Sequence, residues 1–155
     1  MREAFLFVHP TLGVVGILAA LWVFVEALKL DESRLRRIKI ASLVGAGLFL
    51  LTWFSGGLWD SFYFEVDRAV MGKGSWAFVG DTAMELKEHL FVVVLLLALY
   101  LPILAFATDL RRAGTTRLPT MTVSALIVLL GLAMEGAGAI LAASVHVGMT
   151  TSLGS

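Results

Sequence analysis

Hydrophobic residues of this chain gather in four long runs separated by shorter polar stretches. The runs cover Phe5–Leu30, Ile38–Gly57, Leu90–Ala107 and Thr120–Val147. A bilayer core of about 30 Å requires roughly 20 apolar residues in a helix, so each run predicts a membrane-spanning helix. The first two runs, and the last two, are joined by short connections and are expected to pack as antiparallel neighbours. The pattern predicts an all-α fold, a four-transmembrane-helix bundle that forms a single domain over residues 1–155.

Basic residues are concentrated in the two short connections. Residues 29–39 and 108–119 hold eight of the twelve Lys and Arg residues, whereas acidic residues predominate in the long connection between the second and third spans. Because basic loops of membrane proteins stay in the cytoplasm, loops 31–37 and 109–118 are predicted to be cytoplasmic and both termini outside. The expected location is the inner or plasma membrane of a bacterium or archaeon.

The long outer connection contains a segment with helical periodicity. From Trp59 to Val70 the apolar residues recur at helical spacing, and Asp60, Glu65 and Asp67 fall largely elsewhere. This pattern predicts an outer interfacial amphipathic helix with its aromatic face in the lipid and Asp67 accessible from outside, rather than a fifth span. Gly72-Lys73-Gly74 is expected to end this helix. Asp81 is expected to cap the next helix, which continues into the third span.

Composition narrows the classes of function. The chain is 59% apolar and 15% charged, against about 25% charged residues in a soluble domain. Its net charge is zero, which argues against a nucleic-acid partner. The absence of cysteine excludes disulfides, thiolate catalysis, iron–sulfur clusters and covalently attached c-type haem.

The three histidines of the chain all fall near the predicted outer ends of spans. His9 lies in the first span, His89 at the start of the third and His146 at the end of the fourth. Neutral imidazole is the usual axial ligand of haem b, and helical bundles build such sites from facing helices. A haem would use two of these histidines. A non-haem transition metal would use all three, with Glu85, one turn before His89, as a further ligand or as a hydrogen-bond partner. The alternative is interfacial placement without a ligand.

Small residues follow two of these histidines along a helical stripe. His9 continues through Gly13 and Gly16, and His146 continues back through Gly138 to Gly131. Such stripes allow close packing of helices, and they also leave a flat void for a planar cofactor.

Glu135 lies near the middle of the fourth span. A carboxylate at this depth is costly unless it is paired or protonated, so it is a candidate proton carrier or a hydrogen-bond partner of a cofactor propionate or quinone. The structural alternative is a protonated carboxyl group bonded to a neighbouring helix. Glu26, near the cytoplasmic end of the first span, is expected to pair with Lys29 or Arg37.

Short motifs give the chain a resemblance to a known group. His9-Pro10 in the first span, His89 at the start of the third, Glu135-Gly136-Ala137-Gly138 in the fourth and the terminal His146-Val147-Gly148 carry it. With these motifs the chain resembles small bacterial four-helix integral membrane proteins of unassigned function, in which binding of b-type haem is suspected. The resemblance covers the spans and implies haem ligation by the histidines. A second histidine that is usual near His9 in that group is missing here.

Two kinds of function follow from these patterns. One is an electron-transport protein with haem b or another metal near the outer face, which exchanges electrons with a membrane quinol or a redox partner protein. The other is an accessory or structural subunit without a cofactor, within a larger membrane complex. A non-haem iron or other three-histidine metal site is a further alternative. In each case the partners include membrane lipid, and assembly as a homo- or hetero-oligomer is compatible with the sequence.

Overall fold

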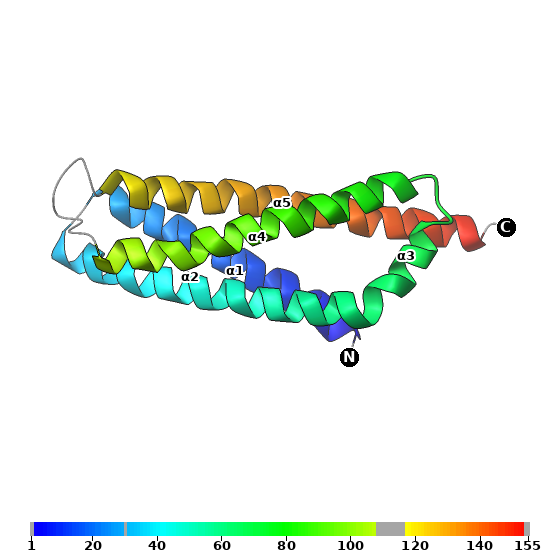
Figure 1. Cartoon of the computed structure of the whole chain (residues 1–155), viewed down its shortest axis with the longest axis horizontal. Helices are drawn as coiled ribbons and strands as arrows, with labels where there is room; N and C mark the ends of the chain where they lie inside the picture. Colours follow the sequence, from blue (N-terminus) through cyan, green and yellow to red (C-terminus); the bar gives the residue numbers. More distant parts are fainter. Residues whose placement is uncertain (1, 30, 108–116, 154–155) are drawn as a thin grey trace.

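The chain folds into a bundle of four long helices with one short helix at its end (Figure 1). The computed structural model describes residues 2–29, 31–107 and 117–153. The long helices are α1 (Arg2–Leu28), α2 (Glu32–Trp59), α4 (Ala77–Ala107) and α5 (Arg117–Leu153), and a π-helical turn, η1 (Asp60–Phe64), joins α2 to the short α3 (Glu65–Met71). No strand occurs in these ranges. The predicted all-α four-helix bundle is therefore confirmed.

The helices extend beyond the predicted spans because polar residues continue them. Asp31 caps α2, and its Oδ1 accepts a hydrogen bond from the backbone N–H of Arg34 at 2.9 Å. Gly72 follows the last residue of α3, as expected. The prediction that Asp81 caps the following helix is wrong, because α4 already begins at Ala77. The Asp81 carboxylate instead pairs with the Arg68 guanidinium of α3 at 3.2 Å.

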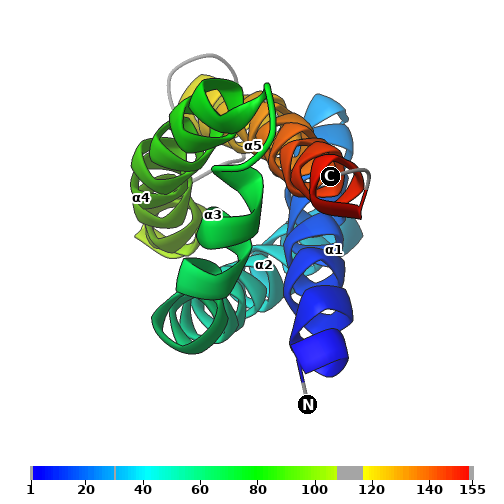
Figure 2. The ribbon, with the colours of Figure 1, turned by 90° about the vertical axis from the view of Figure 1, so that its right-hand side faces the viewer.

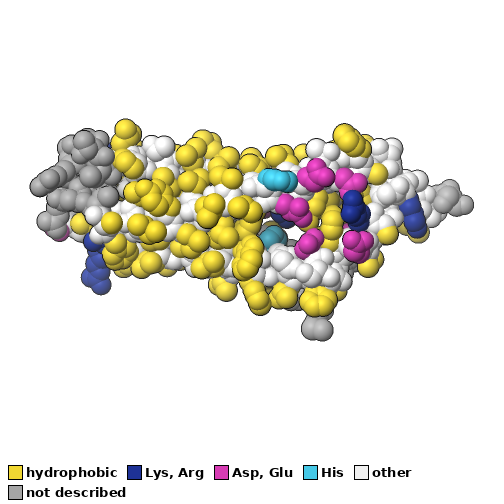
Figure 3. All heavy atoms as spheres, in the orientation of Figure 1, with side chains coloured by type: hydrophobic (Ala, Val, Ile, Leu, Met, Phe, Trp, Pro, Cys, Tyr) yellow, Lys and Arg dark blue, Asp and Glu magenta, His cyan; other side chains and the backbone are white. Residues whose placement is uncertain are grey.

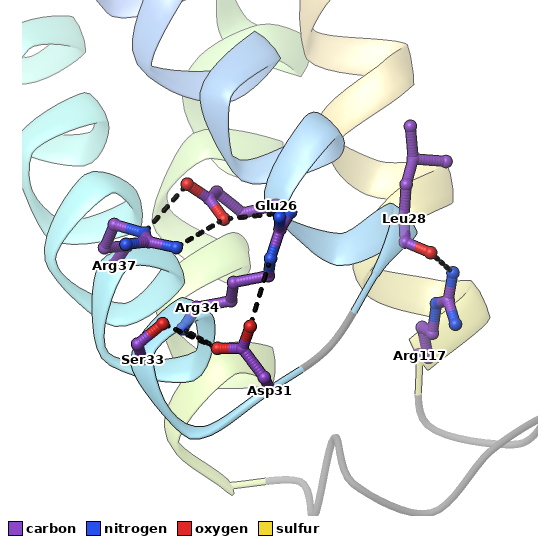
Figure 4. A network of polar contacts seen from close by, with 7 residues as sticks. All are labelled: Glu26, Leu28, Asp31, Ser33, Arg34, Arg37 and Arg117. Carbon is purple, nitrogen blue, oxygen red and sulfur yellow. Dashed lines mark hydrogen bonds and ion pairs between the residues drawn. The ribbon is translucent and has the colours of Figure 1, made fainter.

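A network of charged side chains joins the helices at the end of the bundle where α1 meets α2 (Figure 4). The Glu26 carboxylate of α1 lies 2.9 Å from Nε of Arg37 and 3.4 Å from Arg34, both on α2. The expected pairing of Glu26 with Arg37 is thus observed. Arg117 of α5 donates a hydrogen bond to the carbonyl of Leu28. Arg111 and Arg112, in the second loop that is predicted to be cytoplasmic, lie outside the described residues.

Asp31 takes part in the same network through two short hydrogen bonds. The Ser33 hydroxyl donates to its Oδ1 at 2.6 Å, and the backbone N–H of Arg34 donates to the same atom. The bond from Ser33 is the largest influence that lowers the pKa of Asp31 below its ordinary value.

The tightly packed core occupies the half of the bundle next to this network. In that half α1 packs on α2 and α5, and α4 packs on α5 and α2. Gly16 and Gly131 permit this contact, since a Cβ on Gly16 would lie 3.1 Å from the Phe49 ring and one on Gly131 would lie 2.7 Å from Ile17. At these two glycines the small-residue stripes serve close packing of helices. The buried core residues are Ile17, Ala20, Val23, Ala27, Ile38, Phe49, Val94, Ala98, Leu101, Leu104, Ala105, Val123 and Ile127.

The opposite half of the bundle is more open, and α3 crosses its end (Figure 2). Figure 1 shows α2 and α4 moving apart toward this end, where both termini also lie. α3 packs on α5. It turns Asp67 inward, where only 5% of the residue is exposed, and leaves Phe62 of η1 72% exposed. The predicted short helix therefore begins at Glu65 rather than at Trp59. Of its predicted lipid-facing aromatic residues, Phe62 is exposed, but Trp59 ends α2 and lines the cavities described below. The expected accessibility of Asp67 is wrong. Its carboxylate faces the bundle because α3 caps the bundle end.

The outer surface of the four helices is apolar (Figure 3). Large exposed side chains include Leu18, Leu51, Leu96 and Leu129, which are more than half exposed. Four helical segments are long and apolar enough to cross a membrane, namely Leu6–Leu28, Glu32–Met71, Ala77–Ala107 and Arg117–Leu153. Fold and surface together indicate an integral membrane protein.

Candidate functional site

Two neighbouring cavities occupy the open half of the bundle. The larger, of about 580 Å³, lies mainly between α1 and α5 below α3, and the smaller, of about 240 Å³, lies between α2 and α4. His9, Trp59 and Lys87 line both of them. The larger cavity falls in the range of about 300–1,000 Å³ that is usual for small-molecule and cofactor sites. Figure 3 shows charged and histidine side chains around a hollow on the face where α2 and α4 separate.

His9 is held in one tautomer by α2. Its Nδ1 lies 3.0 Å from the carbonyl oxygen of Thr52, and because a carbonyl only accepts, Nδ1 carries the proton and donates. The Ser55 hydroxyl donates to the same carbonyl at 3.1 Å. Gly56 lets the ring approach α2 this closely, since a Cβ there would lie 2.7 Å from Cε1 of His9. The unprotonated Nε2 of His9 therefore keeps its lone pair for a ligand.

Glu135 and Lys87 face each other across the larger cavity. Glu135 comes from α5 and Lys87 from α4, and the two side chains attract each other electrostatically. Asp60 of η1 exerts the same attraction on Lys87. Gly13 of α1 makes room for the carboxylate, because a Cβ at that position would lie 2.9 Å from Oε1 of Glu135. The cavity thus contains an acid and a base at a depth where ionisable groups are expensive, which marks it as a functional candidate.

Trp59 presents an unused hydrogen-bond donor to this region. Its Nε1 is buried and has no hydrogen-bond partner in the described part of the chain. The Trp59 ring also contacts the Phe64 ring, with centroids 5.7 Å apart. A buried N–H without a partner is unusual in proteins. This nitrogen has less than 1 Å² of accessible surface, so a ligand in either cavity would reach it only if the Trp59 ring turned.

His89, His146 and Glu85 do not reach the cavities. His89 is exposed, and its Nδ1 donates to the backbone carbonyl of Glu85 one turn earlier, at 2.7 Å. His146 and Glu85 are exposed as well. The structure therefore brings together His9 and Glu135 of the predicted site residues and leaves the other three apart. No group of three or more His, Asp or Glu side chains positioned to hold a metal ion exists among the described residues.

The remaining small residues of the stripes border the larger cavity. Gly138, Ala139 and Ala142 of α5 line it, and a Cβ on Gly138 would meet only Lys87, at 3.9 Å from Nζ. The sequence was compatible with two roles for the stripes of small residues, namely close packing of helices or space for a cofactor. Both occur, because Gly16 and Gly131 pack against side chains whereas Gly138 borders empty space.

Lys87, Trp59 and Asp67 line the site but were not predicted as site residues; the sequence pattern placed Trp59 and Asp67 on the interfacial helix. Lys87 could have been found from helical spacing, since it continues the buried stripe of α4 that includes Ala83 and Val94. His89, two residues further, is turned by about 200° from that stripe. Trp59 could have been found in the same way, since it lies four residues after Ser55 and seven after Thr52 on the buried stripe of α2. Asp67 gives no such signal, because its direction depends on the π-helical turn η1 that precedes α3.

The fold and the cavity define the protein as a four-helix membrane protein. One half of its bundle contains a ligand-sized cavity that is lined by ionisable side chains. No protein family, no curated protein and no solved structure matches the chain. Its function is therefore argued from the geometry of the cavity.

Proposed function

We propose that the protein binds haem b in the larger cavity through His9 and takes part in electron transfer at the outer face of the membrane. The observation that carries this proposal is the orientation of His9, whose Nδ1–H is fixed by the Thr52 carbonyl while the ring borders a cavity of about 580 Å³. A haem-ligating histidine needs this arrangement, since a hydrogen bond at one nitrogen fixes the ring and leaves the other nitrogen for the metal.

The other residues of the cavity are compatible with a haem. Leu141, Val145 and Met149 of α5 supply apolar contacts for the macrocycle. Lys87 supplies a cation for a propionate, whereas the Glu135 and Asp67 carboxylates of the same cavity would repel one, so the propionates would lie on the Lys87 side. When bound, haem would provide a one-electron redox centre. His9 would be the sole histidine ligand, because His89 and His146 line neither cavity. This differs from the two-histidine ligation that the sequence suggested.

We further propose that both termini lie outside and the basic end of the bundle lies in the cytoplasm. The support is the concentration of Lys and Arg in residues 29–39 and 108–119. The cavities and α3 then lie near the outer surface, where a membrane quinol or a redox partner protein could reach them. A reporter enzyme that works only after export should be active when it is fused after Ser155. Activity from a reporter that works only in the cytoplasm would contradict this orientation.

The visible spectrum of the purified protein tests the haem proposal. We expect a Soret band that shifts on reduction with dithionite and that is lost in His9→Ala. His89→Ala and His146→Ala are matched controls, since each removes an exposed imidazole from a long helix, and they should retain the band. A colourless wild-type protein after expression with added haem precursor would refute the proposal, as would an unchanged spectrum in His9→Ala.

A cofactor-free accessory subunit of a larger complex is the second candidate. It is favoured by the lack of a second imidazole at either cavity within the described ranges. In that case the purified protein contains neither haem nor a transition metal by elemental analysis, and His9→Ala still assembles with its partner chains. A non-haem metal site would instead show stoichiometric metal without a Soret band.

A further inference from the structure

The smaller cavity differs from the larger one in shape and lining. It lies between α2 and α4 at the outer end of the bundle, and its volume of about 240 Å³ suits one ring rather than a macrocycle. Trp53 of α2 and Phe91 and Val92 of α4 form its apolar walls. In the same region the two helices move apart toward the end of the bundle that carries α3 (Figure 1).

Polar groups gather at the end of this cavity that adjoins the larger one. Lys87 contributes an ammonium donor and Asp60 contributes a carboxylate acceptor, while the Trp59 ring forms part of the wall. His9 forms part of the wall that the two cavities share. A ligand that fits here has a flat apolar body and oxygen atoms that both donate and accept hydrogen bonds.

We propose that the smaller cavity binds the ring of a membrane quinol. A hydroquinone ring fits between aromatic walls, and its hydroxyl groups can donate to Asp60 and accept from Lys87. Its isoprenoid tail would remain in the lipid at the separation between α2 and α4. The inference rests on the proposed function only in that a haem held by His9 would be the electron acceptor. Binding of the ring itself does not require the haem.

Charge favours a quinol over a phospholipid headgroup. Among the described residues, the lining contains the carboxylates of Asp60 and Glu88 and a single cation, Lys87. A phosphate placed among these groups would face two negative charges, whereas a quinol is neutral.

Two glycines of α2 provide a matched pair of variants to test the site. Gly57 lines the smaller cavity, Gly47 does not, and a Cβ on either residue would meet nothing within 4 Å. Both can therefore be replaced by leucine without a steric clash at Cβ. Gly57→Leu fills part of the cavity mouth, whereas Gly47→Leu adds the same side chain at the lipid-facing surface. All four tryptophans remain in both variants.

The experiment titrates the purified protein in detergent with decylubiquinone and follows tryptophan fluorescence. We expect saturable quenching in the wild type and in Gly47→Leu, and a dissociation constant raised by about tenfold or more in Gly57→Leu. Asp60→Asn, which keeps size and tryptophans, removes the carboxylate that accepts from a quinol hydroxyl. It should therefore raise several-fold the dissociation constant of decylubiquinol, measured by its displacement of decylubiquinone, and it serves if Gly57→Leu does not fold. Quenching that is linear, or equal in all variants, would overturn the quinol site. So would a tightly bound phospholipid, found by mass spectrometry, that decylubiquinone does not displace.

The same samples separate this inference from the haem proposal. Saturable quenching in a protein without a Soret band supports the quinol site and refutes the haem. A Soret band that depends on His9, without saturable quenching, supports the haem and refutes the quinol site.

Discussion

Replacing Gly148 by alanine should destabilise the protein although alanine is the better helix former. Gly148 lies in α5, where α3 packs against it. A Cβ on this residue would lie 2.2 Å from the carbonyl oxygen of Val70 and 3.0 Å from Cα of Met71. These are backbone atoms of α3, so no side-chain rotation relieves the contact. The cap helix would have to move by about 1 Å, as in an overpacked core.

The magnitude follows from comparison with Gly136 of the same helix. A Cβ on Gly136 meets nothing within 4 Å, so Gly136→Ala gains only the helix propensity, about 1 kcal/mol. Gly148→Ala has the same gain but adds an overpacking penalty of about 1–3 kcal/mol. The propensity term cancels between the two variants. Gly148→Ala is therefore expected to be less stable than Gly136→Ala by about 1–3 kcal/mol, with the wild type between them or near the less stable variant.

Thermal unfolding in detergent, followed by circular dichroism, measures this difference. For a chain of this size each kcal/mol corresponds to roughly 2–4 °C in Tm. If Gly148→Ala melts at the same temperature as Gly136→Ala, α3 is not packed on α5 as described, and the cap over the larger cavity does not exist.

Three further predictions concern other parts of the structure. Glu26→Ala should lower the free energy of unfolding by about 2 kcal/mol, and Glu26→Gln by less, because the amide oxygen can still accept from Arg34 and Arg37. Equal losses of the two variants in chemical denaturation would refute this. A cysteine at Asp67 should react slowly with an impermeant maleimide and one at the exposed Glu65 rapidly, so equal rates would contradict the inward direction of Asp67. Because the pKa of Asp31 is lowered in the folded protein, its contribution to stability is present above the unfolded pKa of about 3.9 and is lost as pH falls through the folded pKa. Asp31→Asn should therefore flatten the dependence of Tm on pH below about pH 4.

The four helices could be predicted from the sequence because each depends on local information. Long apolar runs specify the spans, and Gly72 marks the end of α3. The start of α2 was predicted too late, at Ile38, because the cap that Asp31 provides was not recognised in the sequence. Asp81 was placed wrongly at a helix start, since its side chain can either cap a helix or pair with a distant cation. The ion pair with Arg68 forms only when α3 folds back over α4. Tertiary contact therefore decided between two local possibilities.

The direction of side chains around each helix was harder to predict than the helices themselves. All three histidines lie toward the same end of the bundle, but depth along an axis does not say which face a residue occupies. His9 shares its face with Gly13 and Gly16, so its inward direction could be predicted. His89 had no such stripe, and the buried stripe of α4 passes through Lys87 instead. Periodicity on each helix, rather than residue type, indicates which ionisable groups enter the cavity.

The cavity is held open by packing at both of its ends. On one side the large apolar side chains of the core, such as Phe49 and Ile127, fix the spacing of the helices. On the other side α3 is fixed by close backbone contact between Gly74 and Gly148, since a Cβ on Gly74 would lie 2.9 Å from the Gly148 nitrogen. Between these ends, glycines admit the His9 ring and the Glu135 carboxylate where larger residues would exclude them. A void that resulted only from loose packing would be apolar and would not require such accommodation. The ionisable side chains of the lining, the glycines and the close packing of α3 on α5 together favour a cavity built for a ligand.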